Sequence, residues 1–379
     1  MTRVPVNPKL LQWACERSGI AQEYLVAKFK KLPEWESGAR QPTLKQVEAF
    51  AHAVHVPVGY LFLTKPPEEP VPIPDFRTFA GQAVTRPSPN LLDTVYTCQE
   101  RQSWYRDFVR VGGAPELAFV GSATVETPPE TVAVEMRETL GFDLAARRNC
   151  PTWTDALRLF IQQADKAGVL VMVSGVVMSN NRRRLDPEEF RGFALSDSLA
   201  PLIFVNGADT KAAQMFTLAH ELAHLWLGAS ALSNIGTAPQ PGFRREEVWC
   251  NAVAAELLVP LAALHVDELR NDDLPRLART FKVSTLVILR RLLDAGRIDR
   301  PSFDVAWAEE VKRLRHLARG GSGGDFYRTT LSRVSRRFAR AVVASTLEGQ
   351  TLYRDAYRML GVSKTETFNN LRREVGMIG

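Results

Sequence analysis

A His-Glu-x-x-His pattern inside an apolar run constrains this chain more than any other feature. It lies at His220 to His224, within residues 216–228. Four residues are a little more than one helical turn, so a helix here places His220 and His224 on one face, close enough to hold a single ion. Glu221 can reach a water on that ion as a general base. The stretch therefore predicts a zinc-binding helix of the catalytic type.

The surroundings of the pattern favour a buried helix. Apolar side chains occupy the other faces of the run, and Gly228 stands where a C-cap glycine belongs. A buried helix with two hydrogen-bonded histidines is the alternative, since the five-residue pattern also occurs by chance. A second acidic helix at a suitable distance favours the metal.

That second helix is expected over residues 244–260, where an alanine-rich centre permits close helix packing and a proline ends the segment. Glu247 shares a helix face with Asn251, Ala254 and Leu258, whereas Glu246 is one position off that face. Either acid is thus a candidate for a third ligand, and helix geometry alone does not decide between them. The alternative is that both are solvated acids stabilised by the helix dipole.

The second helix also carries a family resemblance. Glu247, Cys250 and Asn251 form a Glu-x-x-[Ala/Cys]-Asn motif, followed by Ala-Ala-x-Leu-Leu-x-Pro. This arrangement resembles the ImmA/IrrE family of metallopeptidases. The resemblance implies a Zn²⁺ cofactor held by His220, His224 and Glu247, with Glu221 as the catalytic residue. It extends to a Pro-Asp-Phe-Arg segment at residues 74–77 and to the N-terminal region.

Composition narrows the class of protein. Among 379 residues, 48 are basic and 42 acidic, and this net charge of +6 is compatible with nucleic acid binding without requiring it. Neither an apolar run long enough for a membrane span nor a leader sequence is recognisable. The four cysteines lie far apart, as in a reduced protein. We expect a cytoplasmic protein that does not bind a membrane.

The N-terminal region predicts a small helical unit. Its Trp-Glu-Ser-Gly segment at residues 35–38 resembles the end of an XRE (Cro/repressor-like) helix-turn-helix. The candidate DNA-binding residues are Lys28, Lys30, Lys31 and Arg40. Pro33, however, leaves little room for a recognition helix, because proline is excluded from helix interiors. A degenerate module kept for dimerisation or partner contact is therefore an equal alternative.

The fold class predicted is α+β and mostly helical. It consists of an N-terminal five-helix HTH-like domain, a zincin-like core and a C-terminal helical domain. Strands are expected at residues 168–173, 190–195 and 201–206, giving a sheet of about three strands before the His-Glu-x-x-His helix. In small zincin peptidases the substrate lies along an exposed edge of such a sheet.

Five segments follow from the proline-rich stretch near residue 70, the Gly-Gly-Ser-Gly-Gly joint at residues 320–324 and the motifs. Residues 1–65 form a helix-turn-helix-like domain, and residues 66–150 a linker with a helical connector. Residues 151–262 form the metallopeptidase core. A helix-turn-helix-like extension follows at 263–319 and a C-terminal helical unit at 325–379.

The sequence therefore predicts a zinc-dependent endopeptidase and transcriptional regulator. By resemblance, its substrate is a helix-turn-helix repressor in a stress, phage or mobile-element response. One alternative is an antitoxin that neutralises a PIN-type nuclease toxin. Another is a DNA-binding repressor with an idle peptidase site. A protein substrate or partner is expected in the first two cases and DNA in the third, and the oligomeric state is left open.

Overall fold

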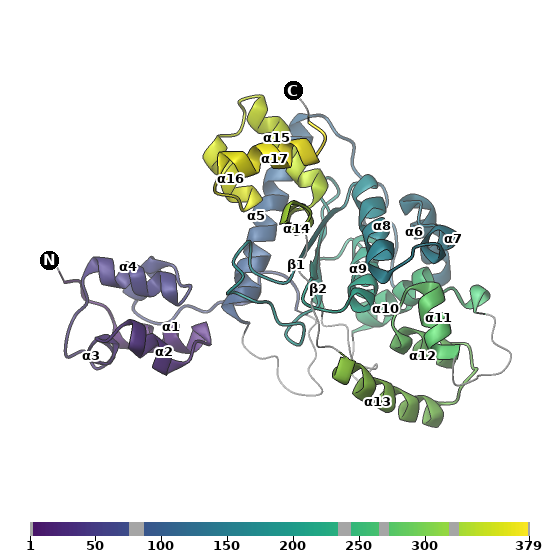
Figure 1. Cartoon of the computed structure of the whole chain (residues 1–379), viewed down its shortest axis with the longest axis horizontal. Coiled ribbons are helices and arrows are strands. Elements are labelled where there is room, and N and C mark those ends of the chain that lie inside the picture. Colours follow the sequence, from purple (N-terminus) through teal and green to yellow (C-terminus); the bar gives the residue numbers. More distant parts are fainter. Residues whose placement is uncertain (1–2, 76–86, 234–243, 265–272, 318–325, 378–379) are drawn as a thin grey trace. The chain divides into compact units, whose positions relative to one another are not determined.

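The computed structural model describes residues 3–75, 87–233, 244–264, 273–317 and 326–377. Over these ranges the chain forms 17 α-helices and one four-stranded sheet (Figure 1), which confirms the α+β, mostly helical class. The chain divides into two compact units. The described part of the first unit consists of residues 3–72 and 87–95. The second unit consists of residues 73–75 and of all described residues from Tyr96 onward.

The first unit is helical. It contains α1 (Pro8–Ser18), α2 (Gln22–Lys28), α3 (Leu32–Glu36), α4 (Leu44–Ala53) and a 3₁₀ helix, η1 (Val58–Phe62). Leu10, Trp35 and Phe50 lie in its buried core. The side chain of Thr43 accepts the N–H of Gln46 and caps α4. These five helical segments agree with the expected five-helix domain.

The second unit is built around a mixed sheet. Its strands are β1 (Leu170–Ser174), β2 (Gly192–Leu195), β3 (Leu202–Asn206) and β4 (Ala231–Ser233), in the order β1-β3-β2-β4. β1 runs parallel to β3, while β2 is antiparallel to both β3 and β4. The first three strands lie where the sequence predicts them, and β4 is an addition that the sequence did not reveal.

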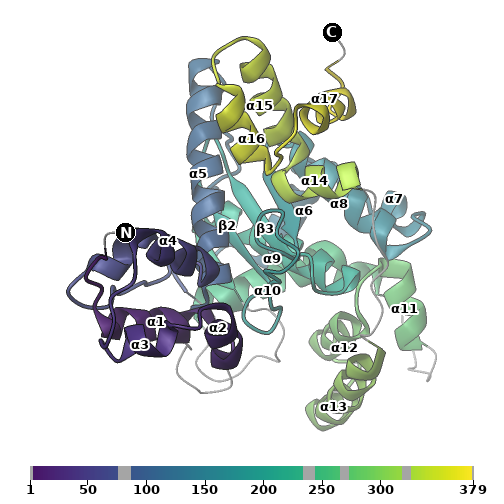
Figure 2. The same ribbon diagram turned by 60° about the vertical axis from the view of Figure 1, so that its left-hand side comes forward.

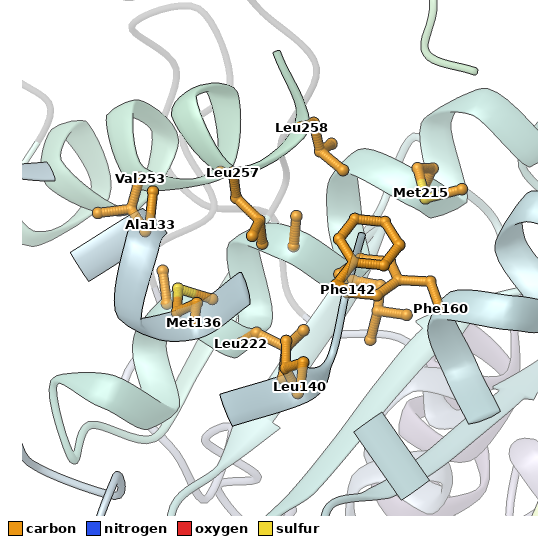
Figure 3. Packing of buried hydrophobic residues seen from close by; sticks show 14 of the residues in the cluster. Ala133, Met136, Leu140, Phe142, Phe160, Met215, Leu222, Val253, Leu257 and Leu258 are labelled. Atoms are coloured by element: carbon orange, nitrogen blue, oxygen red, sulfur yellow. The ribbon is translucent and has the colours of Figure 1, made fainter. Parts of the chain in front are cut away.

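Helices α8 (Trp153–Lys166) and α9 (Lys211–Trp226) cover one face of the sheet, and α10 (Arg245–Leu258) and α6 (Pro129–Leu140) pack beyond α9. Figure 3 shows the apolar side chains that fill the space between these helices. Burying one large aliphatic or aromatic side chain contributes about 1.5–3 kcal/mol, so this layer holds α9 and α10 firmly against each other.

The other face of the sheet carries the C-terminal part of α5 (Pro89–Val111), α14 (Phe326–Val334) and α15 (Arg336–Leu347). Cys98 of α5 lies against Met172 of β1, with 4.0 Å between the sulfur atoms, whereas the neighbouring Val171 belongs to the opposite core. The buried Arg101 of α5 donates to the carbonyl of Met359 at 3.0 Å. The sheet is thus enclosed by helices on both faces (Figures 1 and 2).

Three further helices follow the core: α11 (Asp273–Phe281), α12 (Thr285–Asp294) and α13 (Arg300–Leu317). Ser284 caps α12 by accepting the N–H of Val287, a role that serine commonly takes at the start of a helix. The chain ends with α16 (Tyr353–Leu360) and α17 (Thr365–Glu374).

Three arginines hold the C-terminal end of α10, and we call them the arginine clamp. Arg137 of α6 donates to the carbonyl of Glu256 at 3.0 Å, and Arg147 of α7 (Leu144–Arg148) donates to that of Leu258. Arg291 of α12 donates to the carbonyl of Val259 at 2.8 Å and pairs with the Glu256 carboxylate. Cations are favourable at this end of a helix because its carbonyls carry partial negative charge.

Two features named from the sequence lie outside the described residues, namely Phe76 and Arg77 of the Pro-Asp-Phe-Arg segment and the joint at residues 320–324. Of the helices described, none combines the length and the apolar character needed to cross a membrane.

Candidate metal centre

Helix α9 is fixed at both ends by its own sequence. Thr210 accepts the N–H of Ala213 at the start. At the end, Gly228 has a φ of 68°, and its N–H donates to the carbonyl of Leu225 at 2.9 Å. The next N–H, of Ala229, donates to the carbonyl of His224 at 3.0 Å. This Schellman motif requires the left-handed conformation that glycine adopts freely, so Gly228 ends the helix one turn after His224.

The two histidines converge with Glu247 from the start of α10. The Nε2 atoms of His220 and His224 are 3.1 Å apart. Glu247 places Oε2 at 3.3 Å from Nε2 of His220 and Oε1 at 3.0 Å from Nε2 of His224. Within the described ranges, this is the one cluster of three or more His, Cys, Asp or Glu side chains whose ligand atoms lie close enough to hold a metal ion, all within 4.8 Å. Glu246, the alternative ligand, is outside the cluster.

This donor set fits zinc. Two imidazole nitrogens and one carboxylate oxygen make up a known catalytic zinc site, which leaves a fourth coordination position for water. Asn251 supports the arrangement because its Oδ1 lies 3.1 Å from Nδ1 of His220. With Nδ1–H donating to this oxygen, the lone pair of His220 Nε2 is directed toward the other ligands. The sequence placed Asn251 on the face of Glu247, but gave it no role.

Glu221 is completely buried beside this cluster. Neither of its carboxylate oxygens makes a hydrogen bond of normal geometry with the described residues. Burial raises the pKa of Glu221 well above its usual value, the Glu247 carboxylate raises it further, and the nearby Ser233 hydroxyl partly opposes the shift. The carboxylate of Glu221 is therefore a stronger base than that of an exposed glutamate, and it is suited to exchanging a proton.

Strand β2 approaches Glu221 so closely that only glycine fits. A Cβ atom added to Gly192 would lie 2.5 Å from Cγ2 of Thr217, 2.9 Å from the carbonyl oxygen of Phe204 and 3.1 Å from Oε1 of Glu221. Glycine inside a strand often marks such a close approach. Gly192 was not among the predicted site residues, although a glycine inside a predicted strand is the sequence signal of such an approach.

The charges within the cluster compensate one another. Burial alone would raise the pKa of Glu247, but His220 and His224 outweigh it and hold the pKa below its usual value. Burial lowers the pKa of His224, against the opposing effect of Glu247. The hydroxyl of Ser233, at the end of β4, donates to Oε1 of Glu247 at 3.5 Å. Ser233 was not predicted, because β4 has no recognisable strand pattern.

The outer side of β4 is covered by a segment of the same chain. The N–H of Leu232 donates to the carbonyl of Pro74 at 2.9 Å, and Asp75 pairs with Leu232 in a parallel bridge. We call residues 73–75 the edge segment. The side chains of His220, Glu221 and His224 are 0% exposed and Glu247 is 4% exposed. The exposed sheet edge expected for a peptidase of this kind is therefore occupied at Leu232, and the cluster itself is closed to solvent.

The predicted DNA-binding residues belong to the first unit and surround the short helix α3. Lys28 ends α2 with its Nζ 5.7 Å from the centre of the Phe29 ring. Lys30 and Lys31 form the connection to α3, and Arg40 pairs with Glu34 at 3.3 Å. Helix α3 has five residues, with Pro33 in its first turn. Proline is tolerated at this position because the first N–H groups of a helix have no partner within it.

Comparisons with known proteins assign two parts of the chain. Residues 334–374 match a domain of unknown function (DUF8813). No curated protein and no solved structure matches the chain. Residues 164–293 match the IrrE N-terminal-like domain, and this range contains all four strands, α9 and α10. The candidate metal centre thus lies in a region similar to the N-terminal domain of IrrE, which supports the ImmA/IrrE family of zinc metallopeptidases.

Proposed function

We propose that this protein is a zinc-dependent endopeptidase whose substrate is a helix-turn-helix repressor. The observation that carries the proposal is the convergence of His220, His224 and Glu247, with ligand atoms within 4.8 Å of one another, beside the buried Glu221. The similarity of residues 164–293 to the IrrE N-terminal-like domain supports the same chemistry. The nature of the substrate rests on the family resemblance.

Each residue of the site has a distinct role in the proposed reaction. His220, His224 and Glu247 would hold zinc, and Asn251 would orient the ring of His220. When bound, zinc supplies Lewis acidity toward a peptide carbonyl and makes water acidic near neutral pH. A carboxylate oxygen of Glu221 accepts the proton of the attacking water and returns it to the leaving amine. The burial of Glu221 supports this role because it raises the pKa of the carboxyl group, and a higher pKa makes the carboxylate a better proton acceptor.

The test compares the wild-type protein with Glu221→Gln. Both are loaded with zinc and incubated with helix-turn-helix repressors encoded by neighbouring genes. We expect the wild type to cleave one of them at a defined bond and Glu221→Gln to leave it intact with the same zinc content, because the proton acceptor is not a ligand. Equal cleavage by both proteins would contradict the proposed role of Glu221.

A second candidate is an antitoxin that binds a PIN-type nuclease toxin. The complete burial of His220, Glu221 and His224 favours it, since a substrate has no access to the cluster in this conformation. In this case zinc would serve stability rather than catalysis. Stoichiometric copurification with a small acidic nuclease, whose activity is blocked equally by wild type and Glu221→Gln, would support the antitoxin. Repressor cleavage that depends on Glu221 would support the peptidase.

A further inference from the structure

The last three helices, α15 to α17, form a small bundle with its own apolar core. Phe338 and Val342 of α15, Leu360 of α16 and Phe368 of α17 are all completely buried. The ring of Phe368 also lies 5.6 Å from that of Tyr357 in α16. The match to the domain of unknown function, residues 334–374, ends with α17 and spans all three helices. The bundle is therefore a module with a role to be assigned.

The connection between α16 and α17 is a tight turn of four residues, 361–364. Gly361 has a φ of 66°, and its N–H donates to the carbonyl of Arg358 at 3.2 Å. The following N–H, of Val362, donates to the carbonyl of Tyr357 at 2.9 Å. A short turn that contains glycine, between two packed helices of about this length, is characteristic of a helix-turn-helix. In that motif α17 occupies the place of the second, DNA-reading helix.

The outward face of α17 is polar and suited to reading base edges. Phe368 and Leu371 point into the bundle and are completely buried. The exposed residues at the start of the helix and along it are Ser363, Lys364, Thr365, Glu366, Asn369, Arg373 and Glu374. Positions 365, 369 and 373 repeat every four residues, so they form one stripe. Asparagine pairs with adenine, arginine with guanine, and glutamate accepts from the cytosine amino group. The negative charge of Glu366 is therefore compatible with a position in the major groove of DNA.

The charge of this region also favours binding to DNA. Residues 334–374 contain eight Lys or Arg and four Asp or Glu, a net charge of +4, whereas the whole chain carries +6. About a tenth of the chain thus provides most of the positive excess. Arg354, in the first turn of α16, has a side chain that is 82% exposed, and its Nε lies 3.6 Å from Oδ1 of Asp355. The first helix of a helix-turn-helix crosses the phosphate backbone, where such an arginine is favourable.

We propose that α15 to α17 form a DNA-binding helix-turn-helix. In this arrangement α17 enters the major groove of duplex DNA, and Asn369 and Arg373 contact base edges. Arg354 and Lys364 contact phosphates. Arg337 takes no part, because it is bound to the backbone and side chain of Asp165. This activity is separate from the metal centre and does not depend on peptidase function.

The test uses the full-length protein. Duplexes are selected from a random-sequence library, and the selected duplex is then titrated at several salt concentrations. Asn369→Ala and Arg373→Ala should weaken its binding by roughly 5- to 150-fold each and relax the preference at one base position. Lys364→Ala should weaken binding to all sequences alike and reduce the slope of log K against log salt by about 1. Lys312→Ala, which removes an exposed lysine on α13, is the matched control and should bind as the wild type does.

Thermal unfolding shows whether each variant is folded, which we expect because the substituted side chains are exposed. Three results would overturn the proposal. The wild type could select no sequence from the library. The α17 variants could bind the selected duplex as tightly as Lys312→Ala does. The preference could also disappear in Lys30→Ala and persist in Arg373→Ala, which would assign DNA binding to the first unit.

Discussion

Glu246 and Glu247 provide a matched test of the metal ligands at the residue scale. They are adjacent in the first turn of α10, but only Glu247 reaches the two histidines. Glu247→Ala should no longer bind stoichiometric zinc. Its zinc affinity should fall by more than the roughly 10- to 100-fold that is typical when an outer-shell partner is removed. Glu246→Ala should keep it. Metal analysis after dialysis measures both. Zinc retained in Glu247→Ala and lost from Glu246→Ala would move the ligand by one residue.

Asn251 should act through the orientation of His220. We expect Asn251→Ala to bind zinc about 10- to 100-fold more weakly, because the ring of His220 loses the acceptor for its Nδ1–H. Asn251→Asp keeps an acceptor oxygen at the same position and should retain most of the affinity. Competition with a chelator of known zinc affinity measures the difference. Equal affinities for the wild type and Asn251→Ala would exclude this role.

The raised pKa of Glu221 predicts how stability depends on pH in the metal-free protein. The unfolded chain releases this proton near the ordinary value of 4.5, whereas the folded protein retains it to higher pH. The free energy of unfolding should therefore fall as pH rises above 4.5 and through the raised pKa of the folded state, by at most about 1.4 kcal/mol per pH unit.

Glu221→Gln cannot ionise at this position, so its stability should lack this decline. Urea denaturation of both metal-free proteins across the same pH window makes the comparison. Glu247, with a lowered pKa, contributes stability that is lost when pH falls below that window, so the two effects separate. Parallel pH profiles for the wild type and Glu221→Gln would contradict the prediction.

At the scale of elements, the edge segment predicts a restraint on the peptidase. Its hydrogen bond from Leu232 to Pro74 occupies an amide that an extended substrate would use. A chain shortened to residues 76–379 should cleave an unstructured peptide faster than one that begins at Ile73, by roughly 2- to 10-fold, the value of one hydrogen bond. Both chains lack residues 1–72, so the comparison isolates residues 73–75. Equal and substantial rates would show that the edge segment does not control access.

The elements of the core were predictable to different degrees. The apolar pattern located α9 and α10, and Gly228 and Pro260 mark their C-terminal ends in the sequence itself. Strand β4 was missed because three residues are too few to show an alternating pattern. Its Ser233 became part of the site only through pairing with β2, a contact between distant parts of the chain. The third ligand required helix-face reasoning together with the family motif.

At the scale of the whole molecule, the first unit should contribute little sequence-specific DNA binding. Helix α3 has five residues and contains Pro33, so it offers a short surface to a major groove. We expect residues 1–65 alone to bind duplex DNA without sequence preference, at about 10⁻⁴ to 10⁻⁶ M at physiological salt. Fluorescence anisotropy with unrelated duplexes measures this. A footprint on one operator at nanomolar protein would show that Lys28, Lys30, Lys31 and Arg40 form a specific reader.

The sequence predicted the order of helical and mixed α+β regions along the chain. It did not predict the DNA-binding role that we propose for α15 to α17. The arginines of these helices were visible, yet a count does not distinguish Arg337, which binds Asp165, from the exposed Arg354. Nor does the sequence show that α14 and α15 cover the sheet opposite α9, since this depends on contacts such as that of Arg101 with the carbonyl of Arg333 in α14. Long-range packing, not local propensity, decides these roles.

The arginine clamp also limits which fragments of this chain could be transferred to another protein by gene fusion. A gene fusion that took only residues 151–262 would carry α10 without Arg137, Arg147 or Arg291. The buried Glu256 carboxylate would then lose its counter-charge, a change that typically costs about 3–5 kcal/mol. The IrrE-like match ends at residue 293, two positions after Arg291. A fragment that keeps all three arginines therefore includes α12 and extends back to α6 and α7.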